Sequence, residues 1–306
     1  MCTDTLVTVS GPTMGTRWSA RVSARHASPA LTTALQAAVA AVDHQMSTWR
    51  PDSDLMRLNA APPGAWVDVG AELIAVLGIA AEVAAASGGA FDIGVGEAVT
   101  AWGFGPAQGH ADEAAIRAAL GRPLRAEVQS DPGGGRARRL NDRRLDLSGV
   151  AKGFAVDQMA EVLRKRSVGG FLAALDGEMV ADGVRPDGRP WAVALEEPDP
   201  LRRAARGVIE VTGCAVATSG DYRHRVQLGA DWLSHTMDPS SGGPVRNRLA
   251  SVTVLAADCA RADAWATALL VSGEVDGPTI ARRRGVEAIF LIRDGEGCRE
   301  LSTLAA

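Results

Sequence analysis

The chain has 306 residues, 46% of them hydrophobic and 22% charged, which is typical of a globular protein long enough to bury a large core. Its formal net charge of −4 and its scattered arginines argue against a surface that binds nucleic acid. The length would allow two domains, but no linker divides the chain, so we expect one domain over residues 1–306.

The cysteines, the apolar segments and the first residues of the chain indicate in which cellular compartment we expect it. The cysteines are too sparse for a disulfide scaffold and too far apart for a zinc site, so we expect free thiols at positions 2, 214, 259 and 298. The most apolar long segment, residues 71–86, contains Glu72 and Glu82, so no membrane span is expected. The first residues lack the basic and apolar regions of a signal peptide, which predicts a cytoplasmic protein.

The first half of the chain alternates apolar stretches with turn residues. Strands are predicted at residues 7–9 and 16–22. Apolar residues at helical spacing predict helices at 31–46, 71–86, 113–120 and 153–166. Two segments are predicted to be irregular, namely a loop at residues 51–63 and a turn between two strands at residues 130–135.

The second half is richer in strands. They are predicted at residues 171–175, 191–195, 208–212, 225–228, 249–255 and 288–292. Helices at 262–271 and 276–284 precede the last of these strands. Several strands are joined by loops too short for a helical crossover, which favours antiparallel pairing. The predicted fold class is therefore α+β, with a mostly antiparallel sheet and flanking helices.

The stretch from Leu145 to Asp157 carries the strongest local signal, because it predicts a short apolar strand, a turn of small residues and a helix in direct succession. Backbone N–H groups at a helix start are unpaired and carry partial positive charge, so such a turn can hold an anion. Among the 32 basic residues Lys stands only at positions 152 and 165, which suggests that Lys152 supplies a compact charge for phosphate. The alternative is a solvated Lys in the first helical turn.

Two further segments carry residues suited to catalysis. Asp263 and Thr267 are four residues apart in a helical pattern, so their oxygens share one face and suit a hard cation such as Mg²⁺. The alternative is a helix cap and its neighbour. His235 opens an HxxDP pattern, and a neutral imidazole can accept a proton near pH 7. The alternative there is a loop His that binds cofactor or packs on Pro239.

Taken together, the motifs of the chain resemble those of the ApbE family, the FAD:protein FMN transferases. They follow the family's order from about residue 14 to residue 273, and are Met14-Gly15-Thr16, Met46-Ser47-Thr48-Trp49, Phe91-Asp92-Ile93-Gly94-Val95-Gly96, Trp102-Gly103-Phe104-Gly105, the stretch 145–157, Ala217-Thr218-Ser219-Gly220-Asp221-Tyr222, Ser234-His235-Thr236-Met237-Asp238-Pro239 and Ala262-Asp263-Ala264-Trp265-Ala266-Thr267. The resemblance implies a T-fold-like architecture. It also implies Mg²⁺-dependent transfer of FMN from FAD to a Thr or Ser hydroxyl of an acceptor protein, with release of AMP.

The resemblance assigns further residues to the site. The carbonyl of Gly149 is expected to join Asp263 and Thr267 in binding Mg²⁺. Asp146 and Lys152 match positions that contact FAD, with Lys152 facing the pyrophosphate, although Asp146 is also placed to cap the following turn.

The positions that surround the adenosine and flavin parts of FAD are matched by Met14, Trp49, Ala90, Phe91 and Asp92. Outside a family context, Met14 and Phe91 would be read as core residues. Trp49 replaces the Tyr that is common in the family, so a stacking ring is kept and a phenol hydrogen bond is lost. The segment 91–99 departs further from the family pattern, with Gly94 and Glu97-Ala98 where the family often has Thr and Pro-Leu, which implies a pocket of different detailed shape. His235 is expected both to contact FAD and to act as the base.

Two alternative functions follow from the same residues, and one further alternative concerns localisation. An Mg²⁺-dependent FAD pyrophosphatase would use water in place of the acceptor hydroxyl and release FMN and AMP. A non-enzymatic FAD-binding protein would need neither the metal ligands nor the base. If the chain is a trimmed lipoprotein, Cys2 is the remnant of its signal and the protein is periplasmic, as many members of the family are.

Overall fold

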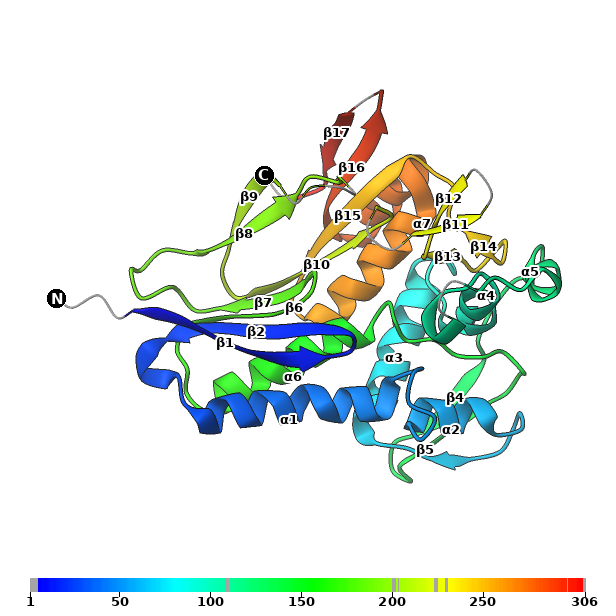
Figure 1. Cartoon of the computed structure of the whole chain (residues 1–306), viewed down its shortest axis with the longest axis horizontal. Coiled ribbons are helices and arrows are strands. Elements are labelled where there is room, and N and C mark those ends of the chain that lie inside the picture. Colours follow the sequence, from blue (N-terminus) through cyan, green and yellow to red (C-terminus); the bar gives the residue numbers. More distant parts are fainter. Residues whose placement is uncertain are drawn as a thin grey trace.

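The computed structural model of the chain describes residues 5–107, 110–199, 202, 204–222, 225–228, 231–295 and 297–304. Its main element is an eight-stranded sheet in which all neighbouring strands are antiparallel (Figure 1). In sheet order the strands are β1 (Leu6–Thr13), β2 (Thr16–Ser23), β6 (Phe171–Leu175), β7 (Glu178–Asp182), β10 (Cys214–Gly220), β15 (Leu249–Ala256), β16 (Glu287–Asp294) and β17 (Gly297–Ser302). The predicted α+β class with an antiparallel sheet is confirmed.

Helices cover one face of this sheet and a hairpin covers the other (Figure 1). Side chains alternate between the faces along a strand, so in β6 Phe171 joins the helical core and Leu172 joins the opposite one. Trp191, in the hairpin, is buried in that opposite core. The covering elements are the helices α1 (Pro29–Met46), α6 (Ala151–Lys165) and α7 (Cys259–Arg284), and the hairpin strands β8 (Trp191–Glu196) and β9 (Ala205–Val211).

A second layer holds α3 against α7 and adds a small sheet. Residues 51–63, predicted to be a loop, contain a helix instead. Ser53 caps it by accepting a hydrogen bond from the N–H of Met56 at 3.1 Å, and Leu55 and Leu58 are buried. The two-turn length of the helix leaves little periodicity for the sequence to show. The elements of this layer are α2 (Asp54–Ala60), β3 (Val67–Asp68), α3 (Ala71–Ala86), β4 (Val128–Asp131) and β5 (Arg136–Arg139).

A smaller, separate core lies at the other end of α3, around Trp102, Leu124 and Met237. The indole N–H of Trp102 donates to the carbonyl of Gly242 at 3.1 Å and so joins the helical part of this core to its hairpins. Its elements are η2 (Ile93–Val95), α4 (Gly96–Ala101), η3 (Gly105–Ala107), α5 (Glu113–Ala119), β11 (Arg225–Leu228), β12 (Asp231–Ser234), β13 (Met237–Asp238) and β14 (Gly243–Pro244), while η1 (Ala24–His26) follows β2 in the main sheet.

Strands β7 and β10 of the main sheet were not predicted, and from α7 onward the fold departs from prediction in two further places. The helices predicted at 262–271 and 276–284 are the two halves of α7, which starts earlier, at Cys259, and is broken at Gly273 by a backbone conformation of φ 77° and ψ −178°. The amide of Asn247 donates to the carbonyl of Leu270 at 2.8 Å, which satisfies a group that the break exposes. The strand predicted to be last is followed by β17, a largely exposed edge strand whose polar residues hide its alternation.

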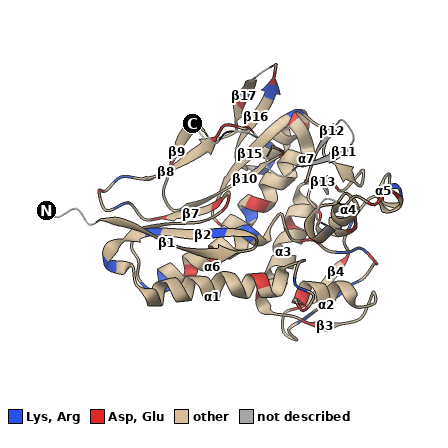
Figure 2. Ribbon diagram, in the orientation of Figure 1, with Lys and Arg blue, Asp and Glu red and all other residues tan. Residues whose placement is uncertain are grey.

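Basic and acidic residues are interspersed along the ribbon (Figure 2). Within the described residues, no helix is long and apolar enough to cross a membrane. Cys214, Cys259 and Cys298 are free thiols, as predicted. Cys2 lies outside the described residues.

Candidate active site

The turn before α6 is built by side chains rather than by a strand. Residues 145–147, predicted as a strand, are irregular. The amide of Asn59 takes the place of a partner strand, since it accepts from the N–H of Leu145 at 2.8 Å and donates to its carbonyl at 2.9 Å. The carboxylate of Asp146 accepts from the N–H of Ser148 at 2.8 Å. The turn-capping role considered for Asp146 is therefore present, and its contact with FAD stays a prediction.

The start of α6 lies directly against the start of α7. The N-cap residue of α6 is Val150, whose side chain makes no capping hydrogen bond. Instead, the N–H of Gly153 in the first turn donates to the carboxylate of Asp263 at 3.1 Å. A Cβ on Gly153 would lie 2.3 Å from the carbonyl oxygen of Cys259, so the two helices can approach this closely only with Gly at the crossing.

The three predicted metal ligands are brought together at this crossing. Asp263 is 4% exposed, and the hydroxyl of Thr267, one turn further along α7, is 3.1 Å from the hydroxyl of Ser219 on β10. A Cβ placed on Gly149 would lie 3.1 Å from the Thr267 hydroxyl oxygen, so the turn and the helix are in contact. One carboxylate, one hydroxyl and a backbone carbonyl form the oxygen set that suits Mg²⁺, with positions left for substrate phosphate.

The described residues contain no group of three His, Cys, Asp or Glu side chains able to hold a metal ion by themselves. A metal at this crossing would therefore depend on the Thr267 hydroxyl and the Gly149 carbonyl as well as on Asp263, with water or substrate phosphate in the remaining positions. This partial shell fits a cation that works on a bound phosphate better than a permanent structural metal.

Lys152 is held by two carboxylates, one from Asp176 in the β6–β7 turn and one from Glu178 at the start of β7. Its ammonium nitrogen lies 2.8 Å from Glu178 and 3.6 Å from Asp176. The pKa of Lys152 is raised, because the attraction of Glu178 and Asp263 outweighs its burial. The prediction that Lys152 faces the pyrophosphate remains a prediction, and the ammonium would keep Glu178 as a neighbour while it did so.

Negative charge exceeds positive charge around Lys152. Burial raises the pKa of both Glu178 and Asp263, and the positive charge of Lys152 opposes the rise. Glu178 is 2% exposed, and its second carboxylate oxygen is buried without a hydrogen-bond partner. Two buried carboxylates beside one ammonium favour the uptake of a proton or a cation.

The segment at residues 90–92 packs against the turn that contains Gly149. The ring of Phe91 would be 3.2 Å from a Cβ on Gly149. The backbone N–H of Phe91 donates to the hydroxyl of Ser87 at 3.2 Å. Phe91 is 4% exposed and belongs to the main core, so the core role weighed for it is present. One oxygen of Asp92 accepts from the N–H groups of Gly94 and Ala126, and burial raises its pKa. Ala90, partly exposed, precedes this braced turn.

Trp49 is accessible, in contrast with the buried crossing, whereas Met14 is partly buried and packs against the main core, so the core role weighed for it is partly present. Met14 has a φ of 46°, an unusual value for a residue with a side chain, in the tight turn that joins β1 to β2. The side chain of Trp49, just after α1, is 57% exposed. In Figure 1 the β1–β2 turn, the end of α1 and the start of α6 lie at one end of the sheet. Exposure suits a ring that stacks on a ligand, although the FAD contacts of both residues stay predictions.

His235 lies beside the smaller core. It is partly exposed and lies edge-on to the ring of Phe104, with 6.4 Å between ring centroids. Asp238 of the same motif holds the following turn by accepting from the N–H and the hydroxyl of Ser240 at 2.8 Å and 2.7 Å. The role of His235 as base stays a prediction.

Sequence reasoning missed three side chains of the crossing: Asp176, Glu178 and Ser219. The Asp176-Gly177 pair is a hairpin signal that could have predicted the β6–β7 turn. Ser219 lies within one of the motifs named above, without an assigned role.

The chain matches known proteins over almost its full length. The model of the ApbE family matches residues 14–290. Relatives named FAD:protein FMN transferase from Klebsiella pneumoniae and Escherichia coli K12 are 33% and 32% identical, and the alignments cover 96% and 95% of this chain and 86% of each relative.

Solved structures agree with this assignment. The flavin transferase ApbE of Vibrio cholerae superposes with a TM-score of 0.85 at 31% identity, covering 97% of both chains. The flavinyl transferase ApbE of Pseudomonas stutzeri superposes with a TM-score of 0.84 at 33% identity, covering 98% of this chain and 94% of that one. With its motifs, fold and close-packed α6–α7 crossing, this chain belongs to the ApbE family.

Proposed function

We propose that this chain transfers FMN from FAD to a Thr or Ser hydroxyl of an acceptor protein, in an Mg²⁺-dependent reaction that releases AMP. The proposal is supported by the family and by full-length relatives that carry the name FAD:protein FMN transferase. The observation that carries it is the meeting of Gly149, Asp263 and Thr267 beside Lys152, because these residues come from two motifs more than a hundred residues apart.

The chain's own residues supply positive charge and a base, and they orient the substrate. Lys152 faces the pyrophosphate of FAD, and the accessible ring of Trp49 stacks on part of the dinucleotide. His235 accepts the proton of the acceptor hydroxyl as that oxygen attacks the phosphorus on the FMN side. The new P–O bond joins FMN to the acceptor, the bond to the AMP phosphate breaks, and AMP leaves with its charge.

The residues at the crossing fit Mg²⁺. Asp263, Thr267 and the Gly149 carbonyl would hold it, and when bound it supplies charge neutralisation at the phosphate oxygens. The surplus of carboxylates around Lys152 favours a cation at this place for the same electrostatic reason.

The test is incubation of the chain with FAD, Mg²⁺ and a candidate acceptor, followed by mass spectrometry of the acceptor. An adduct of the mass of FMN is the expected product. Free FMN and AMP without an adduct would favour the pyrophosphatase, and unchanged FAD would favour a binding protein.

Replacement of the predicted base separates chemistry from binding. His235→Ala is expected to keep FAD bound while transfer falls by roughly 10²–10⁴-fold, the usual loss when a general base is removed. Fluorescence titration of FAD and the mass-spectrometric assay measure the two effects. Joint loss of binding and transfer would give His235 a binding role in place of a catalytic one.

A further inference from the structure

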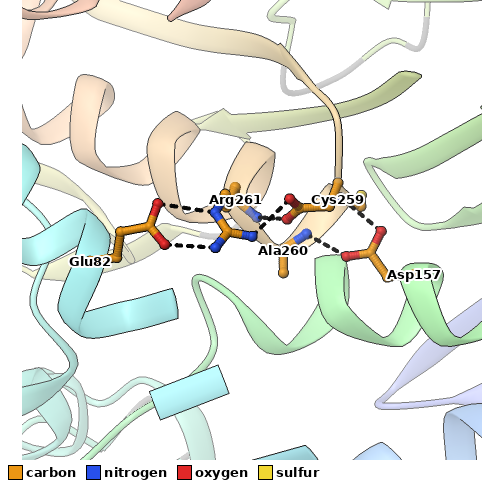
Figure 3. Close-up of polar contacts among 6 residues, drawn as sticks. Glu82, Asp157, Cys259, Ala260 and Arg261 are labelled. Carbon is orange, nitrogen blue, oxygen red and sulfur yellow. Dashed lines mark hydrogen bonds and ion pairs between the residues drawn. The ribbon is translucent and has the colours of Figure 1, made fainter. Parts of the chain in front are cut away.

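The first turn of α7 receives most of its hydrogen-bond acceptors from carboxylates. Asp258, its N-cap, accepts from the N–H of Arg261 at 2.9 Å. The N–H groups of Cys259 and Ala260 donate instead to the two carboxylate oxygens of Asp157, at 2.8 Å and 2.9 Å. Asp157 belongs to α6, as Figure 3 shows. The start of α7 is therefore capped by a side chain of another helix.

This contact has a counterpart in the opposite direction. One turn earlier on α6, the N–H of Gly153 donates to Asp263, which lies one turn later on α7 than the residues held by Asp157. Each helix thus provides a carboxylate for the free N–H groups of the other. A single contact would leave α7 free to pivot on α6, whereas two contacts a turn apart fix both its rotation and its position along the axis.

The position of α7 relative to α6 matters for the proposed metal site. Gly149 comes immediately before α6, whereas Asp263 and Thr267 lie on α7, so their separation is the position of one helix relative to the other. The contact of Gly149 with Thr267 and the close approach of Gly153 to Cys259 leave little tolerance in that position.

We propose that Asp157 is a positioning residue for the metal ligands, because it holds the start of α7 against α6 and so sets Asp263 and Thr267 opposite Gly149. The inference rests on the proposed function, since it assumes that these three residues bind the metal. Asp157 itself would touch neither the metal nor FAD.

The chain offers two matched controls at the same helix end. Asp258→Asn changes the same charge one residue before α7, and Asn is as good an N-cap as Asp. Glu82→Gln weakens a different link to α7. The carboxylate of Glu82, which belongs to α3, accepts two hydrogen bonds from the guanidinium of Arg261, at 2.6 Å and 3.1 Å (Figure 3). Neither residue connects α6 with α7.

The experiment measures metal binding to the whole chain by the EPR signal of free Mn²⁺, without FAD, and in parallel the Mg²⁺ concentration that gives half-maximal FAD turnover. In Asp157→Asn an amide N–H₂ replaces one of the two acceptor oxygens. We expect it to raise the Kd for Mn²⁺ and the Mg²⁺ midpoint roughly tenfold or more, as loss of a group that orients a metal ligand does. Turnover at saturating Mg²⁺ should remain close to wild type, and both controls should stay within about twofold of wild type.

The outcomes are distinct. If Asp157→Asn binds Mn²⁺ like wild type, or if a control weakens binding equally, Asp157 has no positioning role. If Asp263→Ala binds Mn²⁺ like wild type, the proposed metal site is wrong and the positioning role is overturned with it. If Asp157→Asn does not fold, Asp157→Glu decides, because it keeps both acceptor oxygens but displaces them by one methylene. A Kd above that of wild type supports the proposal, and an unchanged Kd overturns it.

Discussion

The α6–α7 crossing differs from the surface around Trp49, called the rim below, in how far its functional side chains are exposed to solvent. At the crossing Asp263 and Glu178 are 4% and 2% exposed, and their partners are fixed N–H groups or Lys152. At the rim, Trp49 is 57% exposed. A buried charge needs a fixed partner, whereas a stacking ring tolerates movement. Changes at the crossing should therefore affect chemistry and stability together, and changes at the rim should affect binding alone.

The largest effect is expected from the carboxylate at the crossing. Asp263→Ala should abolish both flavin transfer and FAD hydrolysis, as EDTA should with the unaltered chain, and added Mg²⁺ should rescue the EDTA-treated chain alone. Thr267→Ala should be milder, since a neutral hydroxyl contributes less than a carboxylate to holding a dication. The mass-spectrometric assay with and without Mg²⁺ measures each.

Full turnover by Asp263→Ala in metal-free buffer would contradict the mechanism. The melting temperature of Asp263→Ala is the required control, because Asp263 also accepts from the N–H of Gly153 and so contributes to the fold. It is expected to fall below that of wild type, and the variant must still be folded at the assay temperature.

The second prediction concerns the buried ion pair. Glu178→Gln should lower the free energy of unfolding by about 2–3 kcal/mol, because it removes the nearest counter-charge of the partly buried Lys152 and alters a fully buried side chain. The double variant Lys152→Met with Glu178→Gln should recover part of that loss. Urea unfolding of wild type, Lys152→Met, Glu178→Gln and the double variant measures the coupling. Additive losses would show that the pair contributes nothing specific.

The rim gives the third prediction. Trp49→Ala should weaken FAD binding by about 1–3 kcal/mol, in the range for loss of a stacking ring. Because the ring is largely exposed, the melting temperature should hardly change. Trp49→Tyr, which keeps a ring, is the matched control for titration with FAD. Equal affinity in all three proteins would remove Trp49 from the site.

The smallest expected effect is a pH dependence of stability. Burial raises the pKa of Asp157 to about 6, although its hydrogen bonds to Cys259 and Ala260 lower it. In the unfolded chain the pKa is ordinary, about 4. The folded state therefore binds this proton more tightly, and the stability that it contributes is full below about pH 4 and lost as the pH rises through about 6.

Asp157→Asn removes this titration, so its melting temperature should fall less than that of wild type between about pH 4 and pH 6. Asp258→Asn should keep the wild-type slope. Parallel slopes in Asp157→Asn and wild type would mean that Asp157 titrates as it does in the unfolded chain.

The sequence predicted the parts of the fold that depend on local pattern. Apolar spacing located α1, α3 and α6 to within two residues. It failed where the pattern is short or unconventional. The two turns of α2 hold too few apolar residues to stand out, and residues 145–147 pair with the side chain of Asn59 instead of a strand.

The site shows the same division. Motif positions located Asp263, Thr267 and Gly149, which the structure brings together. Glu178 was missed because it lies 26 residues from Lys152, and the register of β6 with β7 is what brings the pair into contact. The partners of Asp157 are more than a hundred residues away on α7, so no spacing could have indicated its contact.

The reciprocal capping of α6 and α7 has a consequence for the energetics of ligand binding. The carboxylate of Asp263 is already oriented in the metal-free fold by the N–H of Gly153, so its conformational entropy is lost during folding and not when an ion arrives. Preorganisation of this kind raises affinity without adding a contact. The crossing should look the same before and after ion uptake, and the heat of binding should then reflect coordination and dehydration with no refolding contribution.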